Sequence, residues 1–154
     1  MVLFSACMLF TLLGFSQRLT ADKVPAPVKQ AFSKKFPGAA GVQYGMGKKG
    51  YEILFREHGV EKSATFDTAG NWLETETAVT EADIPGAVVN AIVKDFTGFA
   101  IFKVLKVELP GKDPVYKTNL MNETEGFNVE FSARGDLLKK EPLKKEKPAA
   151  PKKK

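Results

Sequence analysis

The stretch Val24–Gly38 occurs twice in this chain. VPAPVKQAFSKKFPG recurs sixty positions later as IPGAVVNAIVKDFTG, from Ile84 to Gly98. The apolar residues of each copy fall at spacings of three and four, which predicts the buried face of an amphipathic helix. Each copy carries a proline near its start, where a helix accepts one, and a glycine at its end, where a helix stops. A repeat of this length indicates one supersecondary unit that is present twice.

Alternating apolar and polar residues follow each predicted helix and predict four strands per copy. We expect strands at 42–46, 51–57, 60–67 and 71–77, and again at 101–108, 115–121, 126–132 and 136–140. Three pairs match at an offset of 65: Tyr51 with Tyr116, Phe66 with Phe131, and Gly70 with Gly135. The sequence therefore predicts an α+β tandem repeat, in which one helix precedes a roughly four-stranded antiparallel sheet. Both helices are expected on one sheet face.

The N-terminal segment is almost uninterruptedly apolar from Val2 to Phe15. It is shorter than the roughly 20 residues that a membrane-spanning helix needs. Its length, with the small residues Gly14 and Ser16 at the -3 and -1 positions of a cleavage site, predicts a cleaved signal peptide, to which we assign residues 1–21. No Lys or Arg precedes the run, so an uncleaved anchor and a buried N-terminal helix stay open as alternatives. Cys7, the one cysteine, would be lost with the signal peptide.

The C-terminal segment is strongly basic. Residues 139–154 hold eight Lys and two Glu, whereas residues 1–138 hold 15 basic and 16 acidic side chains. Because the segment lacks apolar periodicity, we predict a disordered Lys-rich tail at 141–154, after repeats at 22–78 and 79–140. The near-neutral remainder shows no basic face interleaved with aromatic residues, so we expect no nucleic-acid binding. Weak contact of the tail with an anionic envelope surface is an alternative to simple solvation.

Each half combines three features: a P-x-x-V-x-x-A helix ending in F-[PT]-G, a strand with a tyrosine, and a strand–turn, ATFDTAGNWL or VEFSARGDLL. This pattern, over Val24–Leu138, resembles the PepSY-like family of small secreted bacterial proteins, also described as β-lactamase-inhibitor-protein-like. The resemblance implies an α+β tandem repeat with a partly open sheet face, and a periplasmic or secreted location. Leu137 stands where Trp72 does, and Ser132 where Asp67 does, so the halves are expected to present different surfaces.

No residue cluster predicts catalysis. His58, the one histidine, lies in a predicted two-residue turn, without a second His or a Cys to complete a zinc site or a triad. Asp67–Asn71 lacks the spaced acidic ligands of a calcium loop and is predicted as a β-turn. Gly45–Gly50 lacks the helix that follows a phosphate-binding loop. Glu74 and Glu76 point to one side of a strand, where a solvated face is expected. We therefore predict a non-enzymatic protein without catalytic residues, cofactor or metal.

The better functional candidate is a surface. The predicted strand at 101–107, IFKVLKV, is apolar on both faces. We match Phe102 and Val104 to positions beneath the first helix, so Ile101, Leu105 and Val107 are expected on the opposite face. Packing against the other repeat or a covering loop is one explanation, and an open sheet face that binds a partner is the other. The candidate partner-binding residues are Leu54, Trp72, Ile101, Leu105 and Val107.

The leading hypothesis is an exported binding module that recognises a protein or peptide of the cell envelope through this face. Inhibition of a secreted hydrolase is one form that such binding could take, by analogy with the family. The alternative is a binder or sensor of a small molecule or an envelope polymer, with the basic tail aiding attachment. A structural protein without a dedicated ligand is a third hypothesis.

Overall fold

The structure is a computed structural model and describes residues 17–143. The predicted signal peptide and Lys-rich tail therefore lie largely outside the described residues. The described parts of those predicted segments are residues 17–21 and 141–143, and they include strand residues 17–19 and 141–142. Within the described range, no helix has the length and apolar character needed to cross a membrane.

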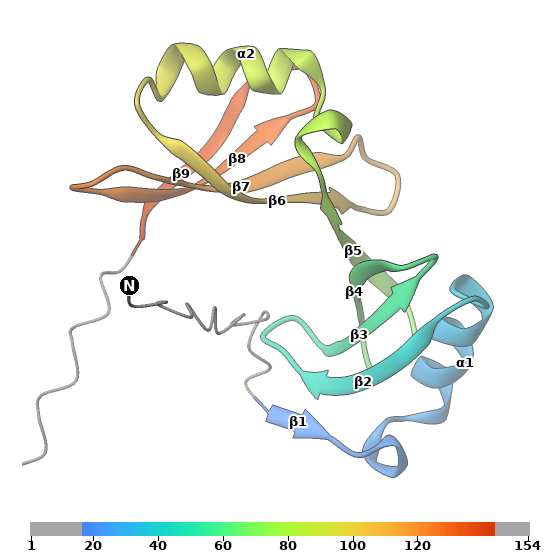
Figure 1. Ribbon diagram of the computed structural model, residues 1–154. Coiled ribbons are helices and arrows are strands. Elements are labelled where there is room, and N and C mark those ends of the chain that lie inside the picture. Colours follow the sequence, from blue (N-terminus) through green and yellow to red (C-terminus); the bar gives the residue numbers. More distant parts are fainter. Residues whose placement is uncertain (1–16, 144–154) are drawn as a thin grey trace, which may run out of the picture.

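Nine antiparallel strands form one sheet, in the order in which they occur along the chain (Figure 1). The first five are β1 (Gln17–Leu19), β2 (Ala40–Met46), β3 (Tyr51–Glu57), β4 (Val60–Phe66) and β5 (Trp72–Val79). The last four are β6 (Ala100–Glu108), β7 (Val115–Met121), β8 (Gly126–Ser132) and β9 (Leu137–Pro142). The helices are α1 (Ala26–Lys35) and α2 (Gly86–Asp95), preceded by the short 3-10 helices η1 (Ala21–Lys23) and η2 (Glu81–Asp83).

The α+β class is confirmed, but the sheet is continuous rather than divided into two four-stranded sheets. Residues Thr75–Val79 of β5 pair with Val104–Glu108 of β6 and join the strands on either side. The polar strand β1, which sequence alternation did not predict, adds an edge beside β2. We call the part from η1 to β5 the first half and the part from η2 to β9 the second half.

Each half has its own hydrophobic core beneath its helix. The α1 cluster consists of Val24, Val28, Phe32, Phe36, Ile53, Phe55, Ala64 and Phe66. The α2 cluster consists of Ile84, Val88, Ile92, Phe96, Val104, Tyr116, Leu120, Val129 and Phe131. Each helix contributes two buried residues four positions apart, as its apolar spacing predicts. The two clusters have no side chain in common.

Both helices cover the same face of the sheet. In the first half, Ala64 of the α1 cluster pairs with Thr75 of β5. Alternation along β5 then brings Val79 to this face, where it pairs with Val104 of the α2 cluster. In Figure 1 the sheet bends between β5 and β6, with α2 above the second half and α1 to the right of the first. The uncovered faces of the two halves consequently form the concave side of the molecule.

Candidate functional site

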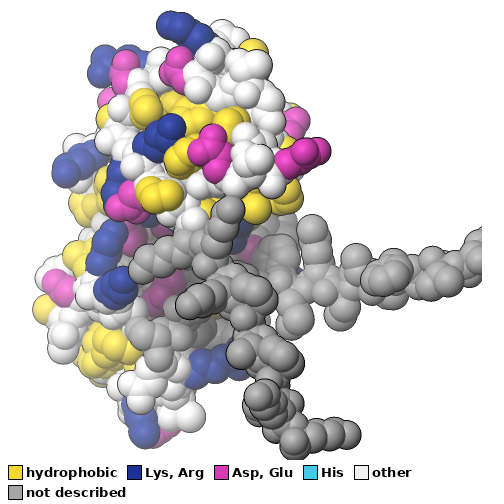
Figure 2. Space-filling view, turned by 90° about the vertical axis from the view of Figure 1, so that its left-hand side faces the viewer, with side chains coloured by type: hydrophobic (Ala, Val, Ile, Leu, Met, Phe, Trp, Pro, Cys, Tyr) yellow, Lys and Arg dark blue, Asp and Glu magenta, His cyan; other side chains and the backbone are white. Residues whose placement is uncertain are grey.

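The sheet face opposite the helices is the surface that the sequence proposed as a binding face. We call it the open face. The pairing register and the alternation of side chains along each strand show which residues lie at its centre. They are Glu52 and Leu54 of β3, Ser63 and Thr65 of β4, Glu74 and Glu76 of β5, Leu105 and Val107 of β6, and Lys117 of β7. Figure 2 looks at the concave side and shows acidic and basic side chains interspersed over both halves.

Three of the five predicted partner-binding residues lie on the open face. Leu54 and Leu105 are half-buried there and remain accessible to a partner. Val107, which pairs with Glu76, has only 2% of its surface exposed and therefore packs within the protein. The open face thus offers Leu54 and Leu105 as its predicted apolar contacts.

Trp72 does not lie on the open face, and its prediction as an open-face residue is wrong. It pairs with Phe66 and packs against the α1 cluster. Its Nε1 donates a hydrogen bond to Thr75 Oγ1 at 2.8 Å, and Lys35 Nζ lies 3.7 Å from its ring centroid. The cause is a register shift between Thr65 and Phe66, which turns the start of β5 toward the helix face.

The prediction that Ile101 lies on the open face is wrong for a similar reason. It pairs with the fully buried Leu120 and packs against the α2 cluster, because the register shifts between Ile101 and Lys103. The shift leaves Phe102, which was predicted beneath the helix, with 60% of its surface exposed. Val104, by contrast, lies under the helix as predicted. Phe102 is thus an exposed aromatic residue that sequence alternation missed, since a one-residue bulge leaves no apolar signal of its own.

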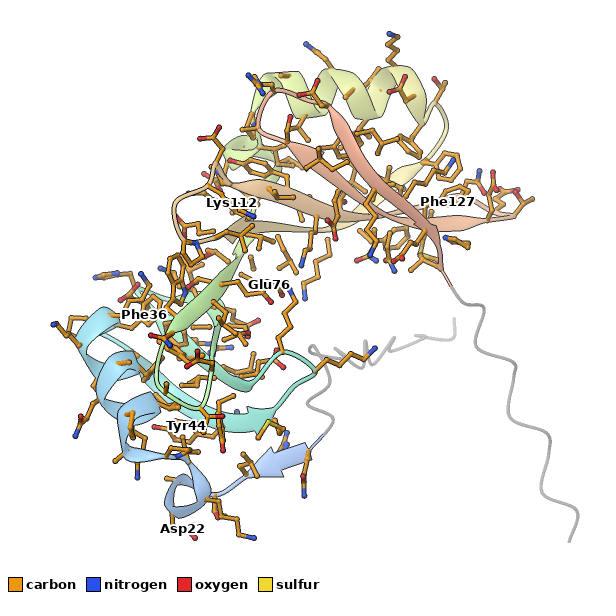
Figure 3. The ribbon with its side chains drawn as sticks, turned by 180° about the vertical axis from the view of Figure 1, so that it is seen from behind. Asp22, Phe36, Tyr44, Glu76, Lys112 and Phe127 are labelled. Carbon is orange, nitrogen blue, oxygen red and sulfur yellow. The ribbon has the colours of Figure 1, made fainter. Side chains whose placement is uncertain are left out.

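Two ion pairs hold the carboxylates of β5 on the open face. Lys49 Nζ, from the β2–β3 turn, lies 2.6 Å from Glu74 Oε2, and Lys117 Nζ lies 2.8 Å from Glu76 Oε1. The side chains of Glu74 and Glu76 are only 11% and 12% exposed. The expectation of a solvated strand face is therefore wrong. Glu76 is labelled at the bend of the sheet in Figure 3.

Two adjoining hollows of about 220 and 260 Å³ lie around these ion pairs. Glu76 and Lys117 line both of them. The first also includes Lys49, Glu52 and Glu74, and the second includes Leu105. Within the described residues, no group of three or more His, Cys, Asp or Glu is arranged to hold a metal ion. The arrangement offers paired charges and apolar side chains to a partner surface.

Glu52 is the third carboxylate in this region. Its Oε1 accepts a hydrogen bond from Ser63 Oγ at 3.1 Å. Burial raises the pKa of Glu52, and the charges of Glu76 and Glu74 raise it further, against the opposing effect of the Ser63 hydrogen bond. For Lys117, burial alone would lower the pKa. The hydrogen bond and charge of Glu76, with smaller contributions from Glu74 and Glu130, outweigh burial and raise it.

We expect Glu52→Gln to stabilise the protein at neutral pH. Because the pKa of Glu52 is raised in the folded state, its protonation favours folding. This stabilisation is complete below the unfolded pKa of roughly 4.3 and is lost as pH rises through the folded pKa. The gain at pH 7 should not exceed about 1 kcal/mol, because the group is partly solvent-screened. Urea unfolding at pH 4 to 8 measures it, with the exposed Glu123→Gln as control. Equal pH profiles for the parent and Glu52→Gln would contradict the prediction.

The two predicted turns have the expected form. His58 and Gly59 adopt φ values of 51° and 80° between β3 and β4, as a two-residue hairpin turn requires. In the turn after β4, Asp67 Oδ1 accepts hydrogen bonds from the backbone N–H groups of Ala69 and Asn71, both at 2.9 Å. Hydrogen bonds from the side chain and backbone of Asn71 lower the pKa of Asp67. His58, Gly59 and Asp67 therefore have a structural role in forming these turns.

Three comparisons with known proteins bear on the fold. The chain is similar to a protein from Bacteroides eggerthii whose structure is titled as one of the "putative periplasmic proteins", with TM-score 0.73, 24% identity, and coverage of 77% of this chain and 88% of that one. It is also similar to a DUF2874 family protein from Bacteroides uniformis, with TM-score 0.73, 23% identity, and coverage of 77% and 88%. A BLIP-like protein from Bacteroides fragilis gives TM-score 0.70, 22% identity, and coverage of 82% and 92%.

These structural similarities support the α+β fold of the chain. A search of the curated proteins found no match. The model of the family described as "Putative beta-lactamase-inhibitor-like, PepSY-like" matches residues 15–61 and 49–139. Since these matches extend over most of the sequence, the chain belongs to the PepSY-like, β-lactamase-inhibitor-like family.

Proposed function

We propose that this protein is an exported, non-enzymatic binding module that recognises a protein or peptide through its open face. The observation that carries the proposal is a concave sheet face that neither helix covers. On it, the half-buried Leu54 and Leu105 lie on the same side of the sheet as the ion-paired Glu74 and Glu76. The family description as inhibitor-like supports this proposal and suggests inhibition of a secreted hydrolase as one form of it.

The proposal includes a tandem repeat and export to the periplasm. The shared order of a 3-10 helix, an α-helix and four strands in each half supports the repeat. The apolar segment from Val2 to Phe15 supports export, and so does the description of the Bacteroides eggerthii structural neighbour as periplasmic. A protein interface combines apolar anchors with polar contacts, and its affinity depends on a few central residues.

Site-specific photocrosslinking in cells tests this function. We expect a photoreactive side chain at Leu54 or Leu105 to form a discrete crosslinked product. The same group at Val93, which is 67% exposed on the outer side of α2, should not form that product. The protein identified in the product should then bind the purified Leu105→Ala variant about tenfold more weakly than the parent, which corresponds to about 1.4 kcal/mol. The Val93→Ala variant should bind like the parent.

Either of two results would contradict the proposal. The first is crosslinking at the open-face positions that does not exceed crosslinking at Val93. The second is unchanged affinity in Leu105→Ala for the protein captured there. The inhibitor form has its own assay: residual hydrolysis by a purified β-lactamase, and by a secreted peptidase, is measured during titration with the protein. The inhibitor form would be supported if the parent protein lowers the rate of hydrolysis and the Leu105→Ala variant lowers it less.

Hollows of about 360 Å³ beside Leu54 and about 670 Å³ beside Phe102 have the size of a small-molecule site, so the small-molecule alternative stays open there. The two hollows around the ion pairs are smaller. Their volumes, about 220 and 260 Å³, lie below the roughly 300–1,000 Å³ typical of small-molecule sites. An envelope polymer could still bind across the surface with help from the basic tail. Cosedimentation with peptidoglycan and with anionic vesicles, with and without residues 144–154, tests that role. Equal sedimentation of the two forms would exclude the tail from attachment.

A further inference from the structure

The junction between the two halves has little apolar material on its helix side. Among residues 17–143 the α1 and α2 clusters share no side chain, so these residues form no common core between the halves. Between the two clusters, strand alternation places Thr77 of β5 and Lys106 and Glu108 of β6 on the helix face. Lys106 Nζ lies 3.3 Å from Glu108 Oε1 on this face. A polar row thus separates the two cores, and the β5–β6 ladder connects them.

On the open face, one ion pair spans this junction. Lys117 pairs in register with Leu105 of β6, and Glu76 pairs with Val107 of the same strand. Lys117 and Glu76 therefore flank β6 from opposite sides, two strand spacings or roughly 10 Å apart at the backbone. Their side chains nevertheless meet, with Nζ and Oε1 separated by 2.8 Å. The pair consequently crosses over β6 and links β7 of the second half to β5 of the first.

The attraction within this pair is less screened by solvent than that of an ordinary surface ion pair. The side chains of Lys117 and Glu76 are 30% and 12% exposed, so solvent screens their attraction only in part. Leu105 and Val107 lie beneath the connection on the strand that it crosses. Val107 is almost fully buried, with 2% of its surface exposed, which shows that this crossing is closely packed. Loss of one partner would leave the other charge poorly solvated.

We propose that the Lys117–Glu76 pair is a strap that sets the angle between the two halves of the sheet, with the β5–β6 ladder as the hinge. The strap holds the sheet bent toward the open face, because it shortens the path from β7 to β5 on that face alone. The width of the concave side then depends on whether the pair is closed. The consequence for partner affinity rests on the proposed function, whereas the strap itself does not.

Distances between spin labels on the two helices test the strap without any partner. Ser33 and Val93 occupy matching positions on α1 and α2 and are both exposed, so Ser33→Cys and Val93→Cys place one label on each half. Cys7, the one cysteine of the sequence, is replaced by Ser. We expect one narrow distance distribution in the parent. Lys117→Met keeps an unbranched apolar stem but removes the charge, and it should broaden this distribution or displace its maximum.

Lys62→Met is the matched control. Lys62 Nζ lies 2.7 Å from Glu57 Oε2, with side chains 22% and 15% exposed, but both residues belong to the first half. Its removal should leave the distance distribution unchanged. The exchanged variant Glu76→Lys/Lys117→Glu re-forms the strap with reversed charge and should restore the parent distribution.

A parent-like distribution in Lys117→Met would overturn the strap. If Lys117→Met does not fold, the exchanged variant decides: a parent-like distribution supports the strap, and a broad one overturns it. Because the readout needs no partner, failure of the strap is distinguishable from failure of the proposed function. A broadened Lys117→Met that also binds the crosslinked protein more weakly would connect the two.

Discussion

Phe66→Ala should lower the free energy of unfolding by about 3–5 kcal/mol. Phe66 is fully buried in the α1 cluster, and its ring packs edge-on against Phe32 at a centroid distance of 6.3 Å. Removing the ring leaves a cavity between α1 and β4 that neighbouring rings can fill only in part. Because a domain of this size is stable by only about 5–15 kcal/mol, the loss is a large fraction of the total. Urea unfolding, with a check that the slope is unchanged, measures it.

The separate cores add a second expectation to this experiment. Among the described residues the α1 and α2 clusters have no member in common, so the cavity should loosen the first half more than the second. Hydrogen exchange should show a larger loss of amide protection in β3 and β4 than in β7 and β8. Val93→Ala, at a position that is 67% exposed, should change stability by no more than about 0.5 kcal/mol. Equal loss of protection in both halves would show that the cores unfold together.

The scaffold could be predicted from the sequence because it depends on apolar periodicity over many residues. The helix positions Val28, Phe32, Val88 and Ile92 were expected to be buried from their spacing, and they are buried. The strands β3, β7 and β8 have the predicted bounds. Each of these elements contains several apolar residues at the same periodic spacing, so one atypical residue does not change the predicted helix or strand.

The candidate site was harder to predict because it depends on single residues. Trp72 and Ile101 each lie beside a register shift, and a shift of one residue moves a side chain to the other face of the sheet. Strand alternation carries no sign of such a bulge. Sequence analysis also predicted that Glu74 and Glu76 are solvated. Their ion pairs could not be foreseen, because the lysine partners lie 25 and 41 residues away along the chain. Strand order and register had to be known before these pairs could be recognised.

The halves differ at the position of Trp72, as their sequences led us to expect. Leu137 stands in its place in the second half and is 44% exposed, whereas Trp72 packs against the α1 cluster. Lys140 instead places its Nζ 3.9 Å from the ring centroid of Phe127, which packs against the α2 cluster. A lysine therefore covers an aromatic edge of each core, from α1 in the first half and from β9 in the second.

Gly70→Ala should destabilise the protein by roughly 2–5 kcal/mol, for two reasons that add. Gly70 has a φ of +87°, which costs a residue with a side chain roughly 1–2 kcal/mol. In addition, a Cβ at this position would lie 2.7 Å from the carbonyl oxygen of Pro27 and 2.9 Å from its carbonyl carbon. Both atoms belong to the backbone of the first turn of α1, so relief requires the helix to move away from the turn.

Gly59→Ala separates the two contributions. Gly59 also has a positive φ, +80°, but a Cβ there would have no neighbour within 4 Å. This variant should lose only the conformational term, roughly 1–2 kcal/mol. Gly135, at the matching position of the second half, would place a Cβ 2.5 Å from the carbonyl oxygen of Ala87, so Gly135→Ala should resemble Gly70→Ala. Thermal or urea unfolding measures these losses of stability. If Gly59→Ala and Gly70→Ala lose equal free energy of unfolding, the contact between α1 and the turn after β4 does not exclude a side chain at position 70. The close approach of α1 to this turn would then not constrain the fold.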